Sequence, residues 1–265
     1  MIDLNNIVNL FTIADCHNSN SFNGLKLIKN VKFDETIQAF LYKHGKDYIL
    51  TFTPYDYKNA YSYLKTGFEI LYNKNLIKVK DGSMNNFFHD YSVKFVESMK
   101  EEMLNLKGKL YITGISLGGA LGQCFYYNLC NNTSFNRQTY ITTFGSPRIG
   151  DIKLKLWFMD KIKEKTKNNT VVYNIVLFKK YEIYRKPDPV CLFPGYENYT
   201  NNSNFFMLLN NQIVPDADIY IPEDLPKMSI YNLFTNKDIS TEWNDIHNIG
   251  EYYENLNSCN LKYIK

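Results

Sequence analysis

Short apolar runs alternate along the chain with longer stretches in which apolar residues recur every three or four positions. The short runs predict β-strands, and the longer stretches predict helices. Strands are predicted at residues 47–52, 110–113, 138–144, 171–178 and 181–185, and helices at 59–71, 89–106, 117–129 and 152–165. Residues 198–224 have an irregular pattern apart from a strand-like run at 218–221, and a last helix is predicted to start near residues 245–247. Strands that alternate with helices predict a mainly parallel sheet covered by helices.

The chain is expected to form one domain over residues 1–265. No internal repeat or low-complexity linker divides it. A chain of 265 residues can bury about three quarters of the surface that it exposes when unfolded, so it needs neither disulfides nor metals to build a core. Its five cysteines are odd in number and never spaced as Cys-x-x-Cys, which favours free thiols over a disulfide framework or a zinc site.

Charge and hydropathy restrict the partners and the location. Thirty basic and 27 acidic residues leave a net charge of +3, which gives no electrostatic reason to expect a nucleic acid partner. The N-terminus lacks the basic start and apolar stretch of a signal peptide, and no run approaches the roughly 18 apolar residues of a membrane span. We therefore expect an intracellular protein.

The sharpest local motif is Gly-Ile-Ser-Leu-Gly at residues 114–118, between a predicted strand and a predicted helix. A serine on a tight strand-to-helix turn is the nucleophile elbow of serine hydrolases. The turn lifts the serine oxygen clear of the sheet, and the two glycines allow the bend and the close approach of the helix. Ser116 is therefore the candidate nucleophile, and the backbone N–H of Leu117 would point at the oxygen of a tetrahedral intermediate.

Chain order selects the candidate base. In hydrolases built on this turn, a carboxylate and then a histidine follow the serine. The chain has four histidines, at positions 17, 44, 89 and 247. Only His247 follows Ser116, so it is the candidate general base.

The candidate acid is Asp188, although eight aspartates and several glutamates follow Ser116. Asp188 directly follows a predicted strand and lies between two prolines, which stiffen the segment that must hold it. Asp245 is too close to His247 to face its ring from the same segment, and we expect it to cap a helix.

Four segments carry a family resemblance in the same order along the chain. They are residues 113–121 (Thr-Gly-Ile-Ser-Leu-Gly-Gly-Ala-Leu), 143–150 (Thr-Phe-Gly-Ser-Pro-Arg-Ile-Gly), 188–194 (Asp-Pro-Val-Cys-Leu-Phe-Pro) and 247–252 (His-Asn-Ile-Gly-Glu-Tyr). Over roughly residues 47–256 the chain resembles the lipase class 3 family, the fungal-type triacylglycerol lipases. The segment 143–150 has no catalytic group, yet it is the most family-specific of the four.

The resemblance implies an α/β-hydrolase fold, with a mainly parallel central sheet and helices on both faces. It also implies a lipid acyl ester as the substrate. Ser116 would attack the ester carbonyl, His247 would accept the serine proton and return it to the leaving alcohol, and Asp188 would orient the imidazole. An acyl-enzyme would form on Ser116, and water would release the acid. No metal or organic cofactor is needed.

The sequence departs from the family at two places. Ile115 stands where the family has His, a position that faces away from the chemistry. More seriously, residues 52–56 are Phe-Thr-Pro-Tyr-Asp where the family has Phe-Arg-Gly followed by Thr or Ser, the segment that supplies the second oxyanion donor. Tyr55 then falls at the donor position, with Thr53 as the alternative if the loop shifts. Losing one such donor costs on the order of 10²–10³ in rate.

Two further expectations concern surfaces. Residues 57–88 are a candidate lid over an acyl pocket, and a plain packing helix is the alternative. The Lys-rich stretches 161–167 and 179–186 are expected to be solvated faces, with attraction to an anionic membrane as the alternative. The expected partners are a lipid ester and, transiently, a membrane or lipid-droplet surface.

Two other functions stay open. The first is phospholipase A1 or short-chain esterase activity, which uses the same triad on another ester. The second is a non-catalytic lipase-like protein that binds a partner or a lipid, which the altered segment 52–56 motivates.

Overall fold

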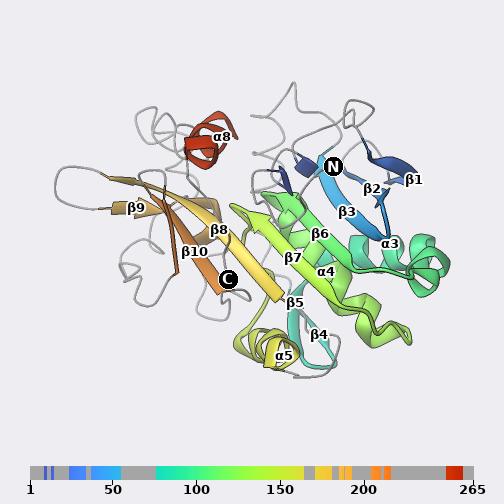
Figure 1. Cartoon of the computed structure of the whole chain (residues 1–265). Coiled ribbons are helices and arrows are strands. Elements are labelled where there is room, and N and C mark those ends of the chain that lie inside the picture. The colour runs from blue at the N-terminus through green and yellow to red at the C-terminus, as the bar shows by residue number, and fades with distance from the viewer. Residues whose placement is uncertain are drawn as a thin grey trace.

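The computed structural model describes residues 9–10, 13–14, 24–33, 37–54, 76–163, 171–180, 185–187, 189–192, 204–209, 212–215 and 249–258 (Figure 1). Within these residues one large sheet runs through the molecule in the order β1-β2-β3-β6-β7-β8-β10-β11, with β9 paired to β8. Its strands are β1 (Lys26–Phe33), β2 (Ile37–His44), β3 (Asp47–Pro54), β6 (Leu110–Ile115), β7 (Thr139–Phe144), β8 (Val171–Lys180), β9 (Arg185–Pro187), β10 (Asn204–Leu209) and β11 (Gln212–Pro215).

The centre of the sheet is parallel and its margins are antiparallel. Neighbours from β3 through β6, β7 and β8 to β10 are parallel, whereas β1 and β2 pair antiparallel with each other and with β3, and β11 pairs antiparallel with β10. The expected mainly parallel sheet is therefore confirmed. A separate hairpin joins β4 (Leu76–Val79) to β5 (Gly82–Asn85).

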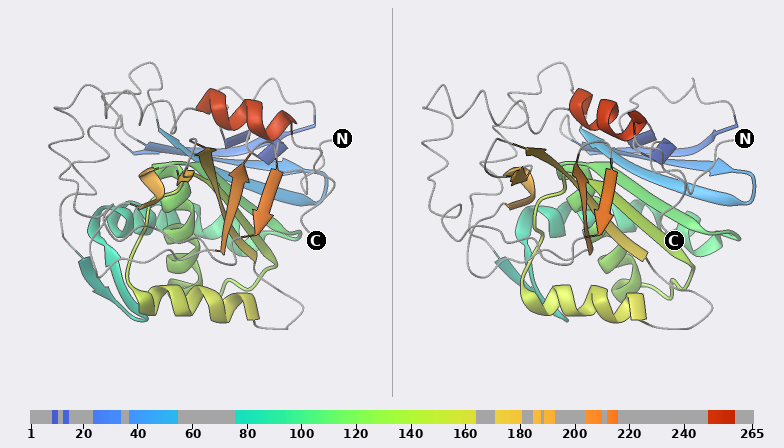
Figure 2. Two further views of the ribbon diagram at one scale, coloured as in Figure 1. Left: turned by 90° about the vertical axis from the view of Figure 1, so that its left-hand side faces the viewer. Right: turned by 60° about the vertical axis from the view of Figure 1, so that its left-hand side comes forward.

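Helices cover the sheet (Figures 1 and 2). They are α3 (Asn86–Asn105), α4 (Leu117–Asn132), α5 (Ile152–Lys163) and α8 (Ile249–Ser258), and a 3-10 turn, η3, spans Pro189–Leu192. The views place α8 beside the carboxyl ends of the parallel strands and α5 at the opposite end. None of the helices in the described residues combines the length and the apolar character needed to cross a bilayer.

Alternation along β6 shows that both faces of the sheet are covered. A Cβ added to Gly122 of α4 would lie 2.9 Å from the side chain of Ile112, so Ile112 faces α4. The next residue, Thr113, points to the other face, where its hydroxyl donates to the carbonyl oxygen of Leu10 at 3.3 Å. Helices on both faces are thus confirmed.

The main core lies between the sheet and helices α3 and α4. Phe52 of β3 is fully buried, with its ring centroid 5.2 Å from Phe95 of α3 and 5.4 Å from Phe125 of α4. Helix α4 is buried at every position from Leu117 to Leu129 because it lies between the sheet and α3. It is therefore held rigidly along most of its length.

Most of the predicted elements are confirmed, with ends that differ by a few residues. The strand predicted at 181–185 shares only Arg185 with β9, and the predicted elements at 59–71 and 218–221 lie outside the described residues. The irregular pattern assigned to 198–224 was wrong in part, because β10 and β11 lie there. Strands β1, β2, β4 and β5 were not predicted. In β2 the reason is that six consecutive residues are buried, so polar and apolar residues do not alternate along the strand.

The candidate lid at 57–88 falls partly outside the described residues. Its described part forms the hairpin β4–β5 and the start of α3. The hydroxyl of Tyr127 donates to the Asp81 carboxylate at 3.2 Å and accepts the Asp81 N–H at 3.1 Å. Tyr127 is eleven residues after Ser116, about 16 Å along α4. The hairpin turn thus lies at the far end of α4 from Ser116, and the lid stays a prediction for residues 57–75.

Candidate active site

Ser116 joins β6 to α4 in a conformation that ordinarily requires glycine. Its φ is 54° and its ψ is −127°, and among the described residues no other non-glycine residue has a positive φ. These angles lie close to those of the first central residue of a type II′ turn, about +60° and −120°, where glycine dominates. The Ser116 N–H donates to the carbonyl oxygen of Phe144 at 2.9 Å, and its own carbonyl accepts the Gly119 N–H at 3.0 Å. The backbone is therefore fixed on both sides of the serine.

Glycines on either side of Ser116 are required by close contacts. A Cβ on Gly114 would lie 2.5 Å from the carbonyl carbon of Gly118, and a Cβ on Gly118 would collide with the carbonyl oxygen of Phe52. The first contact closes the turn, and the second brings the start of α4 against the end of β3. These are the two steric roles that the motif predicts.

Residues 143–146, at the end of β7 and just after it, pack against the start of α4 next to Ser116. A Cβ on Gly119 would lie 2.9 Å from the Cβ atoms of both Thr143 and Ser146. The Ser146 hydroxyl also accepts a hydrogen bond from the Gln123 amide at 3.0 Å, one turn further along α4. The first turns of α4 therefore pack tightly against residues 143–146.

Asn174 of β8 anchors that segment in turn. Its side-chain oxygen accepts from the Thr143 hydroxyl and from the Ser146 N–H, both at 3.1 Å, and its amide donates to the Ser146 carbonyl oxygen at 3.0 Å. All three residues are buried, so these bonds are shielded from water. Sequence reasoning missed Asn174, because nothing in its own neighbourhood indicates a partner almost 30 positions away.

Arg148 extends the network toward the segment that follows Asp188. Burial lowers the pKa of its guanidinium, and interaction with the Cys191 thiolate would raise it. Cys191 is fully buried in η3, which starts one residue after Asp188. Residues 143–148 thus interact with both α4 and η3.

The strand pairing places Ser116 and the end of β9 toward the same edge of the sheet. Ile115 pairs with Phe144, and Phe144 pairs with Ile175, so Ser116 lies just past this line. Strand β8 continues to Lys180, and β9 returns beside it, with Pro187 opposite Phe178.

Asp188 and His247 are themselves outside the described residues. Strand β9 ends one residue before Asp188, whereas the predicted strand at 181–185 ended three residues before it, and α8 begins two residues after His247. Figures 1 and 2 place α8 near the carboxyl ends of the parallel strands. Tyr252, the tyrosine that follows His247 in the fourth motif, is buried in α8.

His44 lies at the opposite edge of the sheet. It pairs with Asp47 in the turn between β2 and β3, and its Nδ1 lies 3.0 Å from the carbonyl oxygen of Gly24. That turn is next to the amino end of β6, whereas Ser116 follows the carboxyl end. His44 cannot act on Ser116.

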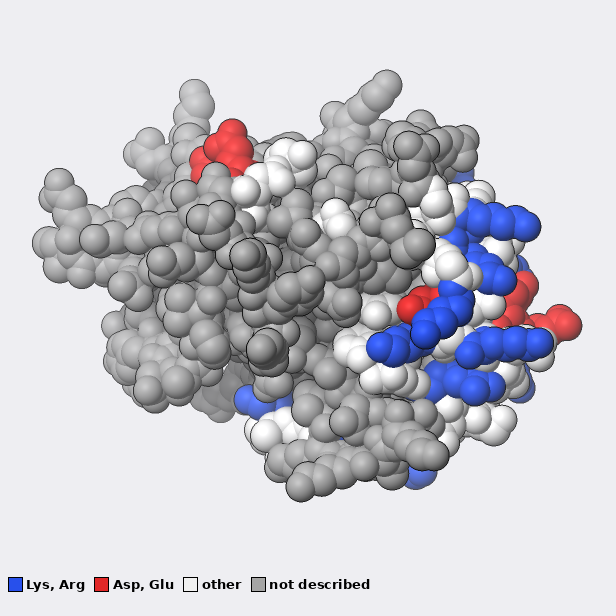
Figure 3. Space-filling model, in the orientation of Figure 1, with Lys and Arg blue, Asp and Glu red and all other residues white. Residues whose placement is uncertain are grey.

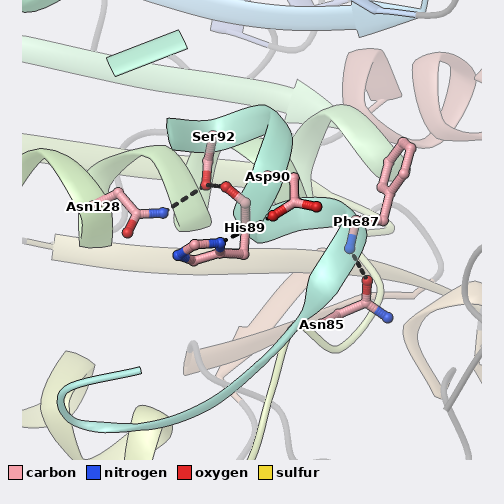
Figure 4. Close-up of polar contacts among 6 residues, drawn as sticks. All are labelled: Asn85, Phe87, His89, Asp90, Ser92 and Asn128. Atoms are coloured by element: carbon pink, nitrogen blue, oxygen red, sulfur yellow. Dashed lines mark hydrogen bonds and ion pairs between the residues drawn. The ribbon is translucent and has the colours of Figure 1, made fainter. Parts of the chain in front are cut away.

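His89 lies on α3, beside Ser92, which contacts Asn128 of α4 (Figure 4). Its Nδ1 lies 3.3 Å from the Asp90 carboxylate, and its carbonyl oxygen accepts from the hydroxyl of Ser92. That hydroxyl also accepts a hydrogen bond of 2.7 Å from the Asn128 amide on α4. Asn128 is twelve residues after Ser116, about 18 Å along the helix. His89 therefore belongs to the packing of α3 against α4.

The structure describes only part of the predicted oxyanion site. Leu117 is the first residue of α4, where backbone N–H groups have no acceptor within the helix. Thr53 is buried next to Gly118, with its nitrogen 3.6 Å from the Cβ position of that glycine. Pro54 ends β3 opposite Ile37 and has no N–H to donate. Tyr55 is outside the described residues.

Within the described ranges, no cluster of His, Cys, Asp or Glu side chains could hold a metal ion. The Cys124 thiol, also on α4, has a pKa raised well above its usual range by burial, so it stays protonated. The reactive group that the fold presents is the hydroxyl of Ser116, on a strained turn at a helix N-terminus. This arrangement suits nucleophilic attack on a carbonyl with charge stabilisation by backbone N–H groups.

Comparison with known proteins agrees with this geometry. The model of the family described as Lipase (class 3) matches residues 50–197. No curated protein matches the sequence.

Solved fungal lipase structures share the fold. The lipase from Rhizopus microsporus var. chinensis is 17% identical, with a TM-score of 0.55 over 75% of this chain and 66% of that one. The triacylglyceride lipase of Rhizomucor miehei is 14% identical, with a TM-score of 0.55 over 82% of each chain. The chain thus spans about two thirds of the Rhizopus protein, and at these identities the likeness shows the fold.

Proposed function

Because the chain belongs to the class 3 lipase family, we propose that it is a serine carboxylester hydrolase that acts on lipid acyl esters, in the manner of a triacylglycerol lipase. The observation that carries the proposal is the backbone of Ser116. A serine with a φ of 54° between a parallel strand and a buried helix carries backbone strain that glycine would avoid. Such strain persists at functional sites, where it aims a side chain.

In the proposed mechanism Ser116 is the nucleophile, His247 the general base and Asp188 the acid of the triad. The Ser116 oxygen bonds to the ester carbonyl carbon while its proton passes to His247. His247 then protonates the departing alcohol, which leaves an acyl group on Ser116. Water repeats the sequence and releases the fatty acid.

Support for His247 comes from the positions of the other histidines. His44 and His89 are excluded by distance, and His17 precedes the serine in the chain. Asp188 is supported by its position in the sequence, directly after β9, whose last residue Pro187 pairs with Phe178 of β8. The Leu117 N–H supplies one oxyanion donor, and the second is assigned to the Tyr55 N–H, with Thr53 as the alternative.

Replacement of the nucleophile tests the proposal. Ser116→Ala should abolish ester hydrolysis and covalent labelling by a fluorophosphonate. The matched control is Ser98→Ala, since Ser98 is a half-buried serine on α3, and it should keep both. Labelling that persists in Ser116→Ala would place the nucleophile elsewhere.

The base and the acid need separate variants. His247→Asn should lower kcat by several orders of magnitude, whereas His89→Asn should leave it unchanged. Asp188→Asn should remain folded by circular dichroism with a large loss of kcat, because the imidazole would lose its orientation. Full activity of Asp188→Asn would assign the acid to another carboxylate.

One observation favours a second candidate, a non-catalytic lipase-like binding protein. Pro54 stands where the family has glycine, and it cannot donate a hydrogen bond to an oxyanion. If the protein hydrolyses no ester although Ser116 reacts with the fluorophosphonate, the result favours the non-catalytic binding protein. Parallel assays on emulsified triglyceride, phospholipid vesicles and a soluble short-chain ester separate a lipase from a phospholipase A1 and from an esterase.

A further inference from the structure

Lysines gather at the end of the sheet opposite Ser116 (Figure 3). Lys26 of β1 pairs directly with Lys43 of β2, and both are exposed. Lys46 lies in the next turn, and its carbonyl oxygen packs against Gly108, the residue after Lys107. Both Lys46 and Lys107 are exposed. The four lysines thus come from β1, β2, the β2–β3 turn and the loop between α3 and β6.

The described residues of β1, β2 and the β2–β3 turn carry no carboxylate of their own, although Glu101 and Glu102 lie on the neighbouring helix α3. Residues 24–33 and 37–46 contain five lysines and no aspartate or glutamate. Lys29, on the same strand, forms an ion pair with Glu102, with 2.6 Å between its Nζ and the carboxylate. Asp47 is half-buried, and its carboxylate accepts the backbone N–H of Lys109. Like charges directly opposite each other on neighbouring strands are destabilising, so the Lys26–Lys43 pair lowers the stability of the sheet rather than raising it.

Two exposed aliphatic side chains adjoin these lysines. Leu27 is 45% exposed and Ile28 is 40% exposed, next to Lys26 on β1, where the register of the β1–β2 pair shifts. Exposed aliphatic groups among lysines suit the interface of a bilayer, because the apolar groups enter the acyl boundary while the ammonium groups stay with anionic headgroups. Within the described residues, β1, β2 and the β2–β3 turn contain no arginine, the residue favoured for forked contacts with nucleic acid phosphates; Arg137, just before β7, lies at the same end of the sheet.

We propose that Lys26, Lys43, Lys46 and Lys107, together with Leu27 and Ile28, form an anchoring surface for an anionic lipid bilayer. The inference rests on the proposed function only for the choice of a lipid partner. The surface lies at the amino end of β6, and Ser116 follows its carboxyl end, about 20 Å away along six residues of strand. Anchoring and hydrolysis are therefore separable.

The test uses the full chain as the Ser116→Ala variant, so that no hydrolysis occurs during binding. Sedimentation is measured with vesicles of phosphatidylcholine alone and with 30 mol% phosphatidylserine added. We expect strong preference for the anionic vesicles, lost when the salt is raised from about 0.1 to about 1 M, where the screening length falls from about 10 to about 3 Å. Equal binding to both vesicles would overturn the proposal.

Substitutions then locate the surface. Each lysine near an anionic membrane contributes about five-fold to partitioning, so K26Q/K43Q/K46Q should bind roughly 100-fold more weakly. The matched control is K80Q/K153Q/K155Q, which removes the same charge around the β4–β5 turn and α5. Equal loss in both triples would mean a general charge effect and would overturn the assignment.

The aliphatic pair has its own control. L27S/I28S should weaken vesicle binding about ten-fold, from the loss of two half-exposed aliphatic groups. I152S/L156S, at 52% and 50% exposure on α5, should not. The proposal would be overturned in favour of a nucleic acid partner if the protein bound duplex RNA or DNA with the same dependence on these lysines and did not bind vesicles.

Hydrolysis gives an independent readout. In an otherwise wild-type chain, K26Q/K43Q/K46Q should hydrolyse a soluble short-chain ester at the unchanged rate. If no ester is hydrolysed but the vesicle results hold, the proposed function fails and the anchoring surface stands.

Discussion

The strain at Ser116 predicts that this serine is costly to the fold. Ser116→Gly removes the Cβ that disfavours a φ of 54° and a ψ of −127°, whereas Ser116→Ala keeps it. Both variants lose the hydroxyl and the activity. The difference in stability between them therefore isolates the backbone conformation.

The expected difference follows from two opposing effects. A non-glycine residue in such a region costs about 1–3 kcal/mol. Glycine also gives the unfolded chain more conformational freedom, which lowers the stability of Ser116→Gly by about 0.4–1 kcal/mol. Ser116→Gly should thus be more stable than Ser116→Ala by about 0.5–2 kcal/mol, or about 1–8 °C in Tm for a protein of this size.

Thermal unfolding of both variants, followed by circular dichroism, measures this difference. The matched control is Ser92, which is buried in the interior of α3. Ser92→Gly and Ser92→Ala lose the same hydrogen bonds. Ser92→Gly should be less stable than Ser92→Ala by about 1 kcal/mol, because glycine is a poor helix former. If Ser116→Gly melts at or below Ser116→Ala, the turn is not strained and the argument from Ser116 fails.

Three further variants probe the surroundings of Ser116 and the far end of α4. Gly118→Ala should lower kcat and cost about 1–3 kcal/mol in urea unfolding, because its methyl group would push α4 away from Phe52. Asn174→Leu should cost about 2–4 kcal/mol, since the buried Ser146 N–H loses its acceptor and the leucine must also be accommodated; a Tm equal to that of wild type would contradict the network. Burial, together with a nearby carboxylate, raises the pKa of Tyr127 to about 12. Stability relative to Tyr127→Phe should therefore be constant below pH 10 and fall between pH 10 and 12, as the unfolded chain loses this proton first.

The sequence was most informative where local pattern and local chemistry coincide. Residues 114–118 predict their own turn, because the glycines, the serine and the flanking strand and helix are all contiguous. Strands β3, β6, β7 and β8 are equally local, since each is a short apolar run between turn residues. The structure describes two of the other histidines, His44 and His89, and both lie away from Ser116, whereas the assignment of His247 stays a prediction.

Other features depend on partners far away in the chain. The charge surface at the amino end of the sheet joins Lys26, Lys43 and Lys107, and only the register of β1 with β2 and the packing of the β2–β3 turn against Gly108 bring these together. Asparagines flank the apolar run of β10. Because asparagine favours turns, they led to the irregular pattern predicted for this region.

The segment at residues 143–150 shows most clearly how a motif without catalytic groups can serve a catalytic turn. A strained residue keeps its conformation only if its surroundings leave it no alternative. Relaxing Ser116 would require α4 to move away from β6, and Gly119 is lodged between the Cβ atoms of Thr143 and Ser146. Those two residues cannot follow α4, because Asn174 of β8 holds both of them by buried hydrogen bonds. The cost of breaking these bonds is comparable with the strain that they maintain, so residues 143–146 hold the nucleophile turn in place although they carry no catalytic group.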